Sequence, residues 1–457
     1  MPRRGWPAWL RASDIADLLR LSAPIAVSRA AMMFMSLTDA IVLGQMAPGE
    51  LPFVLNSWLP MGIALGLGIG ILMGVQVLTS ELMGVGRAGE SGRIFRQGVW
   101  VGIALGVALT VVILPLARPL FDGLGFAPDV AAATASCTRI LALGLVGHMI
   151  THVCGVYLEA LRRPMLVTVL MYGGVAVNAV IDLALVAGWW GVAPMGADGV
   201  AWATTGTRLF LVIVFLVIVA TMTPAFRPAP RGPAGELKRL LGVGTGTAVS
   251  NVAEWGGFNF TFVIATWISL AANVVYGYAI QIVGVAFMLY LGIGSATSVR
   301  VAEAFGRRDP AGVQDAGRLG IAATLLAGLA IGFLILVLRD PIAAALIAAD
   351  AEVEGVAIRP ALIGLLWLVA CLSVFDGLQA TASMALRAQE IVWAPTAVHL
   401  GSFFLVMIPA GYWLGLVQGR GAQGMLEGAF IGVATAGILQ VLLFEWRSAR
   451  GPRLQTV

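Results

Sequence analysis

Four acidic residues lie inside long apolar stretches of this 457-residue chain, where a charged side chain is costly. They are Asp39, Asp182, Glu254 and Asp376. A carboxylate at the centre of a membrane-spanning helix costs about 2.5–3.5 kcal/mol on insertion scales. Four such residues, spread over both halves of the chain, predict a water-filled cavity or a site for a cation.

A purely structural role is the alternative for these acids. They could hydrogen-bond inside the protein or pair with Arg29 and Arg208, two arginines that also fall within apolar stretches. One isolated acid would leave the two interpretations about equal, whereas four acids favour a functional site.

The segment "NAVID" sharpens this prediction, because Asn178 and Asp182 are four residues apart and share one face of a helix. An amide beside a carboxylate can hold a proton or a small hard cation through oxygen ligands.

Other patterns indicate no metal, nucleotide or catalytic site. His148 and His152 have the spacing of metal ligands, but Met149 stands where a metalloprotease has its glutamate, so interior polar packing is favoured. The glycines of "GLGIGILMG" (66–74) follow no strand and suit close helix packing better than phosphate binding. With no Walker motif or catalytic triad, we expect a transporter without cofactors, not an enzyme, that takes its energy from a proton or sodium gradient or from another subunit.

Composition places these residues in a polytopic membrane protein. The chain is 59% hydrophobic and 11% charged, whereas soluble proteins carry about 25% charged residues. The net charge of +4 is no indication of a nucleic-acid partner. Apolar stretches long enough to span a bilayer predict an all-α fold with twelve transmembrane helices. They are 17–45, 52–80, 95–117, 130–157, 165–188, 198–221, 239–268, 271–297, 317–338, 357–384, 394–415 and 425–446.

The spans divide into two lobes of six. Segment 18–32 resembles segment 240–254, and similar loops follow each, which indicates a parallel internal repeat. A stretch with four prolines, "MTPAFRPAPRGPAGEL", separates the halves. We therefore predict an N-lobe over 1–222, a linker over 223–238 and a C-lobe over 239–457.

Basic residues predict the orientation. Alternate connections carry 21 Lys and Arg residues, and the opposite connections carry five. By the positive-inside rule, both termini and the linker face the cytoplasm, in the inner membrane of a bacterium.

Several separated stretches together resemble the multidrug and toxic compound extrusion (MATE) family over nearly the whole chain. The resemblance implies a two-lobed exporter that expels cationic, amphipathic drugs in exchange for protons or sodium ions. The stretches are "APIAV...TDAIVLG" (23–44), "NAVIDLALVAGWWGVAPMGADGVAWAT" (178–204), "GIGSATSVRVAEAFGRRD" (292–309) and "FDGLQATASMALRAQE" (375–390).

By position, the resemblance assigns the coupling site of the N-lobe to Asp39, Asn178, Asp182 and Thr204. Asp39 and Asp182, if brought together, could not both stay ionised in a low-dielectric cavity, so a proton or cation would bind. Pro24 supplies a possible bend in the first span.

The resemblance assigns a C-lobe site for an ion or substrate to Glu254 and Asp376. The NorM-type branch tends to have a tyrosine one turn before the second acid, whereas this chain has Leu372. Asp182 resembles the DinF-type branch, so the coupling ion stays open between proton and sodium.

The favoured function is export of cationic, amphipathic small molecules by a monomer embedded in lipid. Flipping or export of a lipid-linked metabolite is the alternative, although such proteins usually carry more cationic cavity residues. Aromatic, sulfur and amide side chains lie near the acids, and although most such residues face lipid or pack between helices, some could line a cavity for an apolar cation. They are Met33, Trp255, Phe258, Gln281 and Gln379.

Overall fold

The computed structural model describes residues 12–191, 193–230, 232–347 and 350–449. Ten helices in these ranges are long and apolar enough to cross a membrane, and two shorter helices joined at a bend form an eleventh span. Helix α8, which has 33 residues and carries Glu254, corresponds to the predicted stretch 239–268 and completes the set of twelve. The prediction of an all-α protein with twelve membrane spans is confirmed.

The first six spans match the predicted stretches, and one of them is broken. The fourth span, predicted as continuous over 130–157, bends by 45° between α4 and α5. The helices are α1 (Ala12–Met46), α2 (Leu51–Gly84), α3 (Ser91–Gly123), α4 (Pro128–Leu143), α5 (Leu145–Ala160), α6 (Pro164–Leu185) and α7 (Gly196–Met222).

The last six spans also match the predicted stretches. The eleventh span of the chain is irregular. It contains two π-helical segments, η5 and η6, on either side of Pro409, which has no N–H to donate to a regular helix. The spans are α8 (Glu236–Ile268), α9 (Leu270–Gly306), α10 (Pro310–Val337), α12 (Ile358–Arg387), the series α13 (Trp393–Leu400), η5 (Gly401–Met407), α14 (Ile408–Gly411) and η6 (Tyr412–Val417), and α15 (Gly421–Ala449).

A short helix and a β-hairpin connect α10 to α12. Helix α11 (Arg339–Leu346) precedes strands β1 (Glu352–Val353) and β2 (Val356–Ala357), which pair antiparallel. Glu354 and Gly355 both have positive φ angles, as a tight two-residue hairpin requires.

The contacts divide the chain into two compact units whose boundaries fall inside helices. One unit comprises Met1–Ala26 and Val249–Val457, and the other comprises Val27–Ala248. Helices α1 and α8 therefore each contribute to both units. The predicted linker belongs to the second unit, where Arg93 donates to the Pro230 carbonyl at 2.7 Å and to Glu236 at 2.7 Å.

The first part of α1 packs in the same unit as α9 and α10. Its apolar residues Leu18, Leu21 and Ile25 form a cluster with Ala296 and Leu319. In the same way, the first part of α8 packs against α2, where a Cβ atom at Gly74 or Gly244 would overlap the backbone of the partner helix. Glycines at this contact let the two helices approach closely.

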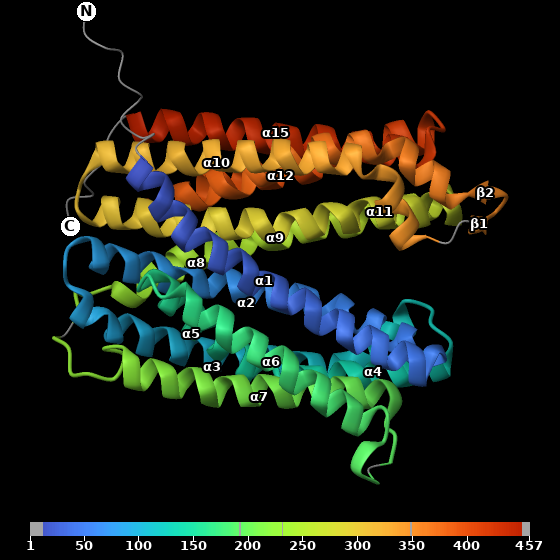
Figure 1. Ribbon diagram of the computed structural model, residues 1–457, viewed down its shortest axis with the longest axis horizontal. Coiled ribbons are helices and arrows are strands. Elements are labelled where there is room, and N and C mark those ends of the chain that lie inside the picture. The colour runs from blue at the N-terminus through green and yellow to red at the C-terminus, as the bar shows by residue number, and fades with distance from the viewer. Residues whose placement is uncertain (1–11, 192, 231, 348–349, 450–457) are drawn as a thin grey trace, which may run out of the picture. The chain divides into compact units, whose positions relative to one another are not determined.

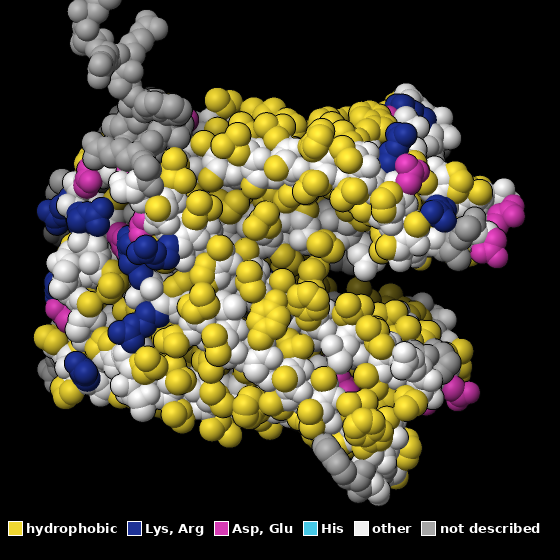
Figure 2. Space-filling view, in the orientation of Figure 1, with side chains coloured by type: hydrophobic (Ala, Val, Ile, Leu, Met, Phe, Trp, Pro, Cys, Tyr) yellow, Lys and Arg dark blue, Asp and Glu magenta, His cyan; other side chains and the backbone are white. Residues whose placement is uncertain are grey.

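The helices within each unit lie side by side (Figure 1). Helices α9, α10, α12 and α15 pack together in one unit, and α3, α4, α5 and α7 pack together in the other. Hydrophobic side chains cover the lengths of the helices, and Lys and Arg side chains gather near helix ends (Figure 2). Large apolar side chains on α10, such as Leu326 and Phe333, are more than half exposed, which suits contact with lipid.

Candidate functional site

Four predicted residues of the N-lobe come together from three helices. Asp39 lies on α1, Asn178 and Asp182 on α6, and Thr204 on α7, and each is less than a tenth exposed. The Thr204 hydroxyl donates to Asp39 Oδ2 at 3.3 Å. The Asp39 carboxyl group also lies close enough to Asp182 and Asn178 to interact with both. We call these four residues the N-lobe acid cluster.

The N-lobe acid cluster is rich in hydrogen-bond acceptors. Asp39 Oδ1, both carboxyl oxygens of Asp182 and the Asn178 side-chain oxygen are buried and have no hydrogen-bond partner among the described residues. Buried carboxyl oxygens are normally paired, and two carboxylates side by side need a proton or a cation between them. The chemistry of these donors and acceptors therefore suits a proton or a small cation bound through oxygen.

Arg208 does not form an ion pair with Asp39 in the described part of the chain. Its Nη1 atom instead donates to the Leu141 carbonyl at 3.2 Å, and the neighbouring Thr205 donates to the Ile140 carbonyl at 3.0 Å. These carbonyls belong to the last turn of α4, whose helical hydrogen bonds end at the bend. Arg208 therefore stabilises the break in the fourth span, and it also acts electrostatically on Asp39.

Arg29 has a partner that the sequence did not indicate. Its Nη2 atom donates to Glu159 Oε1 at 3.0 Å, and Gln76 donates to the other carboxyl oxygen at 3.2 Å. Glu159 is fully buried near the end of α5. His148 and His152 lie earlier on α5, and the Nε2 atom of each is buried without a hydrogen-bond partner in the described residues.

The two predicted acids of the C-lobe are joined by one glutamine. Gln379 Nε2 donates to Glu254 Oε1 at 2.8 Å and to Asp376 Oδ1 at 3.2 Å. Glu254 lies on α8, and Asp376 and Gln379 lie three residues apart on one face of α12. We call these three residues the C-lobe acid cluster.

A tyrosine lies beside Asp376, although it does not come from α12. Leu372 is fully buried in the hydrophobic core, as expected for an apolar residue at that position. Tyr290 of α9 packs against Gly377, where an added Cβ atom would lie 2.8 Å from the tyrosine ring. Its hydroxyl lies near Ser373 and within electrostatic range of the Asp376 carboxyl group. No local sequence pattern links Tyr290 to an acid 86 residues later.

The residues predicted to line a cavity have different surroundings. Met33 is half-buried, and Trp255 and Gln281 are exposed. Phe258 packs against Phe403 with 5.9 Å between ring centroids. Gln379 is fully buried between the two acids.

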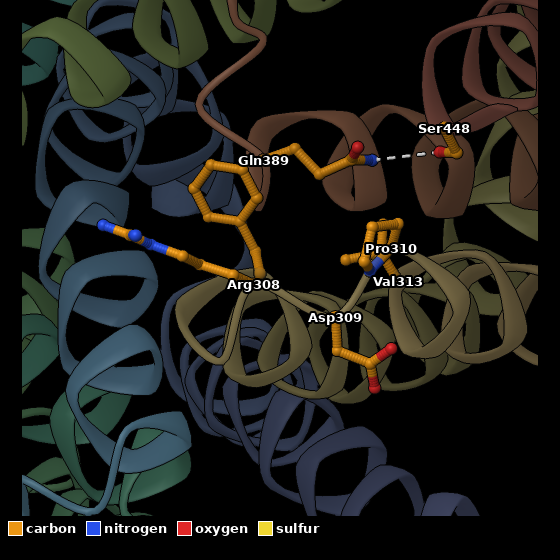
Figure 3. Close-up of a pocket in the computed structure, with 7 residues that line it drawn as sticks. Arg308, Asp309, Pro310, Val313, Gln389 and Ser448 are labelled. Carbon is orange, nitrogen blue, oxygen red and sulfur yellow. Dashed lines mark hydrogen bonds between the residues drawn. The ribbon is translucent and has the colours of Figure 1, made fainter. Parts of the chain in front are cut away.

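A separate pocket lies where the ends of α9, α12 and α15 meet the start of α10 (Figure 3). Gln389 donates to Ser448 at 3.4 Å across it, and the Asp309 side chain points away. Asp309 instead accepts a hydrogen bond from the Gly312 backbone as the cap of α10. None of the predicted site residues lines this pocket.

Comparisons with known proteins match most of the chain. The MatE family model matches residues 24–184 and 247–413. A probable multidrug resistance protein NorM from Caulobacter vibrioides is 33% identical over 453 residues, which cover 96% of this chain and 93% of that protein. Multidrug resistance protein PmpM from Pseudomonas aeruginosa is 29% identical over 453 residues, which cover 96% of this chain and 92% of that protein.

Solved structures share the fold. An outward-facing multidrug resistance MATE family transporter of the MOP superfamily has a TM-score of 0.86 at 19% identity, with 95% of this chain and 96% of that chain covered. A eukaryotic MATE transporter has a TM-score of 0.84 at 14% identity, with 97% of this chain and 99% of that chain covered.

Proposed function

The chain belongs to the MatE family of multidrug and toxic compound extrusion transporters, and we propose that it exports cationic, amphipathic compounds in exchange for protons or sodium ions. The observation that carries the proposal is the pair of acid clusters within the membrane-spanning helices, one in each lobe. Relatives described as multidrug resistance proteins support the multidrug part of the proposal.

Exchange would follow from competition for negative charge. In the N-lobe acid cluster, a proton or sodium ion from outside would neutralise Asp39 and Asp182. A drug cation entering from the cytoplasm would favour the emptied, negative form of the cluster, either directly or through a change of shape. The coupling ion would thus promote release of the drug cation, and the drug cation would promote release of the coupling ion, which is what an antiporter requires.

The charge balance around the N-lobe acid cluster supports a cationic substrate. Arg29 is paired with Glu159, and Arg208 Nη1 is bonded to a backbone carbonyl. A flippase for a lipid-linked metabolite would need cationic side chains to meet a phosphate group. In the N-lobe these two arginines are already engaged, whereas Asp39 Oδ1 and both carboxyl oxygens of Asp182 have no partner among the described residues.

We further propose that the monomer lies in the bacterial inner membrane with both termini and the linker in the cytoplasm. The uneven distribution of Lys and Arg supports this orientation. A cysteine placed at Ala234, after replacement of the exposed Cys371, tests it with an impermeant thiol reagent. Labelling is expected in inverted vesicles and not in intact cells, and labelling of intact cells would contradict the topology.

Transport in everted vesicles tests the exchange itself. Vesicles containing the protein should accumulate ethidium when a proton gradient or a sodium gradient is imposed, and the two gradients are imposed separately to identify the ion. Vesicles without the protein are the control. Movement of anionic compounds alone, or uptake that ignores both gradients, would contradict the proposal.

A further inference from the structure

Arg387 is a buried cation for which the described part of the chain supplies few hydrogen-bond acceptors. It lies in the last turn of α12 and is 6% exposed, although in the sequence it falls among the basic residues of the connections. Its Nε and Nη2 atoms are buried without a hydrogen-bond partner among the described residues. A buried guanidinium group normally has a carboxylate or carbonyl partner, so this arrangement requires an explanation.

Capping the end of α12 does not supply that explanation. The last carbonyls of the helix are satisfied by backbone and glutamine donors without Arg387. Ala388 N donates to the Met384 carbonyl at 3.0 Å, and Gln389 donates to the Leu386 and Ala385 carbonyls at 3.0 and 3.1 Å. The guanidinium group is therefore free to act on another group.

Glu254 is the acidic residue with which Arg387 interacts electrostatically. Arg387 acts electrostatically on the Glu254 carboxyl group and on His399, which bonds to Ser250 through Nδ1. Helices α8 and α12 are the seventh and tenth spans, so they run in opposite directions. Side chains lean toward the N-terminus of their own helix, and Glu254 and Arg387 therefore lean toward each other.

We propose that Arg387 is the internal counter-ion of the C-lobe acid cluster and competes with the transported cation for Glu254. The inference rests on the proposed function, because it concerns how the same cluster releases its cargo. With the cation bound, Glu254 keeps its bond to Gln379, and Arg387 stays unpaired. When the cation leaves, Arg387 compensates the negative charge of Glu254. Release of a tightly held cation from a low-dielectric site thus leaves no unpaired carboxylate.

Arg387→Gln tests the competition, with ethidium binding to the purified transporter and ethidium efflux from cells as the two measurements. Without the competing guanidinium group, ethidium should bind about tenfold more tightly. Efflux should slow at the same time, because release becomes harder. Arg387→Lys keeps the charge and should stay close to the wild-type protein. A residue needed only for folding would lower protein levels without tightening binding.

Arg447→Gln is the matched control. Arg447 lies in the last turn of α15, in the same compact unit, and its guanidinium group stacks on Trp446 at 4.8 Å. The Arg447→Gln substitution should leave the ethidium dissociation constant unchanged. Equal effects of Arg387→Gln and Arg447→Gln would overturn the proposal, since they would reflect net charge alone.

The double variant Glu254→Gln with Arg387→Gln isolates the pair. In the Glu254→Gln background, Arg387→Gln should no longer tighten ethidium binding. If Arg387→Gln alone does not accumulate, recovery of the protein in the double variant supports the pairing, and failure of both variants overturns it. Wild-type protein that neither binds nor exports ethidium would overturn the proposed function and the inference with it. Wild-type transport with unchanged binding in Arg387→Gln would overturn the inference alone.

Discussion

Glu254 on α8 and Asp376 on α12 share the two N–H groups of a single amide, that of Gln379, at 2.8 and 3.2 Å. Two carboxyl groups so close in a partly buried site repel each other when both are ionised. The amide is fully buried and is the one neutral donor that bonds both acids among the described residues. The geometry of the C-lobe acid cluster therefore depends on Gln379.

Replacing Gln379 with methionine should weaken this cluster. The change keeps the length of the side chain but removes both hydrogen bonds, each worth about 1.5–3 kcal/mol when the acceptor is charged. We expect a lower melting temperature and slower ethidium efflux. Gln389→Met is the control, because Gln389 lies just beyond the end of α12 and bonds to Ala385 and Ser448 instead of an acid. Full efflux by Gln379→Met would show that the acids do not need the bridge.

The close contact between α2 and α8 gives a second prediction. A methyl group at Gly244 would overlap the carbonyl group of Ile71, whereas Gly242 has open space around its Cβ position. Gly244→Ala should destabilise the protein by about 1–3 kcal/mol or more, because backbone atoms would have to move. Gly242→Ala should have little effect or a small stabilising one. Thermal unfolding of the purified variants compares them, and equal melting temperatures would contradict the packing argument.

The sequence predicted the spans because their signal is local. An apolar stretch of about 20 residues and alternating basic connections are visible without knowing which helices touch. The break at Gly144 was not predicted, since that glycine is one of 57 and no proline accompanies it. What stabilises the break is Arg208, more than 60 residues later, which donates to the Leu141 carbonyl beside the bend.

In the candidate sites, too, the sequence predicted contacts within one helix but not contacts between helices. Asn178 and Asp182 share a helix face because of their spacing, which the sequence contains. The contact of Asp39 with Thr204 joins α1 and α7, and only the family resemblance suggested it. Glu159 was missed because it lies just beyond the predicted span 130–157, beside Arg162 and Arg163. Its burial is a property of the surrounding helices.

The buried pair of Arg29 and Glu159 gives a third prediction. The two atoms Arg29 Nη2 and Glu159 Oε1 are 3.0 Å apart, and the glutamate side chain is 1% exposed. Arg29→Met should destabilise the protein by about 3–5 kcal/mol, because it leaves a buried carboxylate without its cation. The double variant Arg29→Met with Glu159→Gln should recover much of that lost stability.

The control for this pair is an exposed one. Arg118 and Asp122 form an ion pair at 2.9 Å with side chains 36% and 49% exposed. Arg118→Met should change stability by less than about 1 kcal/mol. Chemical unfolding of the purified variants measures both effects, and a cost for Arg29→Met as small as that for Arg118→Met would show that Glu159 is not dependent on its partner.

The last prediction concerns coupling at Asp39 and Asp182. Asp39→Asn and Asp182→Asn should each abolish gradient-driven ethidium efflux, because an amide cannot take up and release the coupling ion. Membrane levels should stay near those of the wild-type protein, since a neutral amide is less costly in the bilayer than a carboxylate. Drug binding should weaken less than transport, because the carboxylates supply the exchange and not most of the drug contact.

Thr204→Val is the graded variant of the same test. It removes the hydroxyl that bonds to Asp39 Oδ2 and keeps the shape of the side chain, so transport should fall but not disappear. Thr205→Val is the matched control, because the neighbouring hydroxyl bonds to the Ile140 carbonyl and does not contact an acid. Drug binding should release protons, or be opposed by sodium, in the wild-type protein and not in Asp39→Asn with Asp182→Asn. If the double variant still exchanges drug for ion at the wild-type ratio, coupling does not occur at these carboxylates.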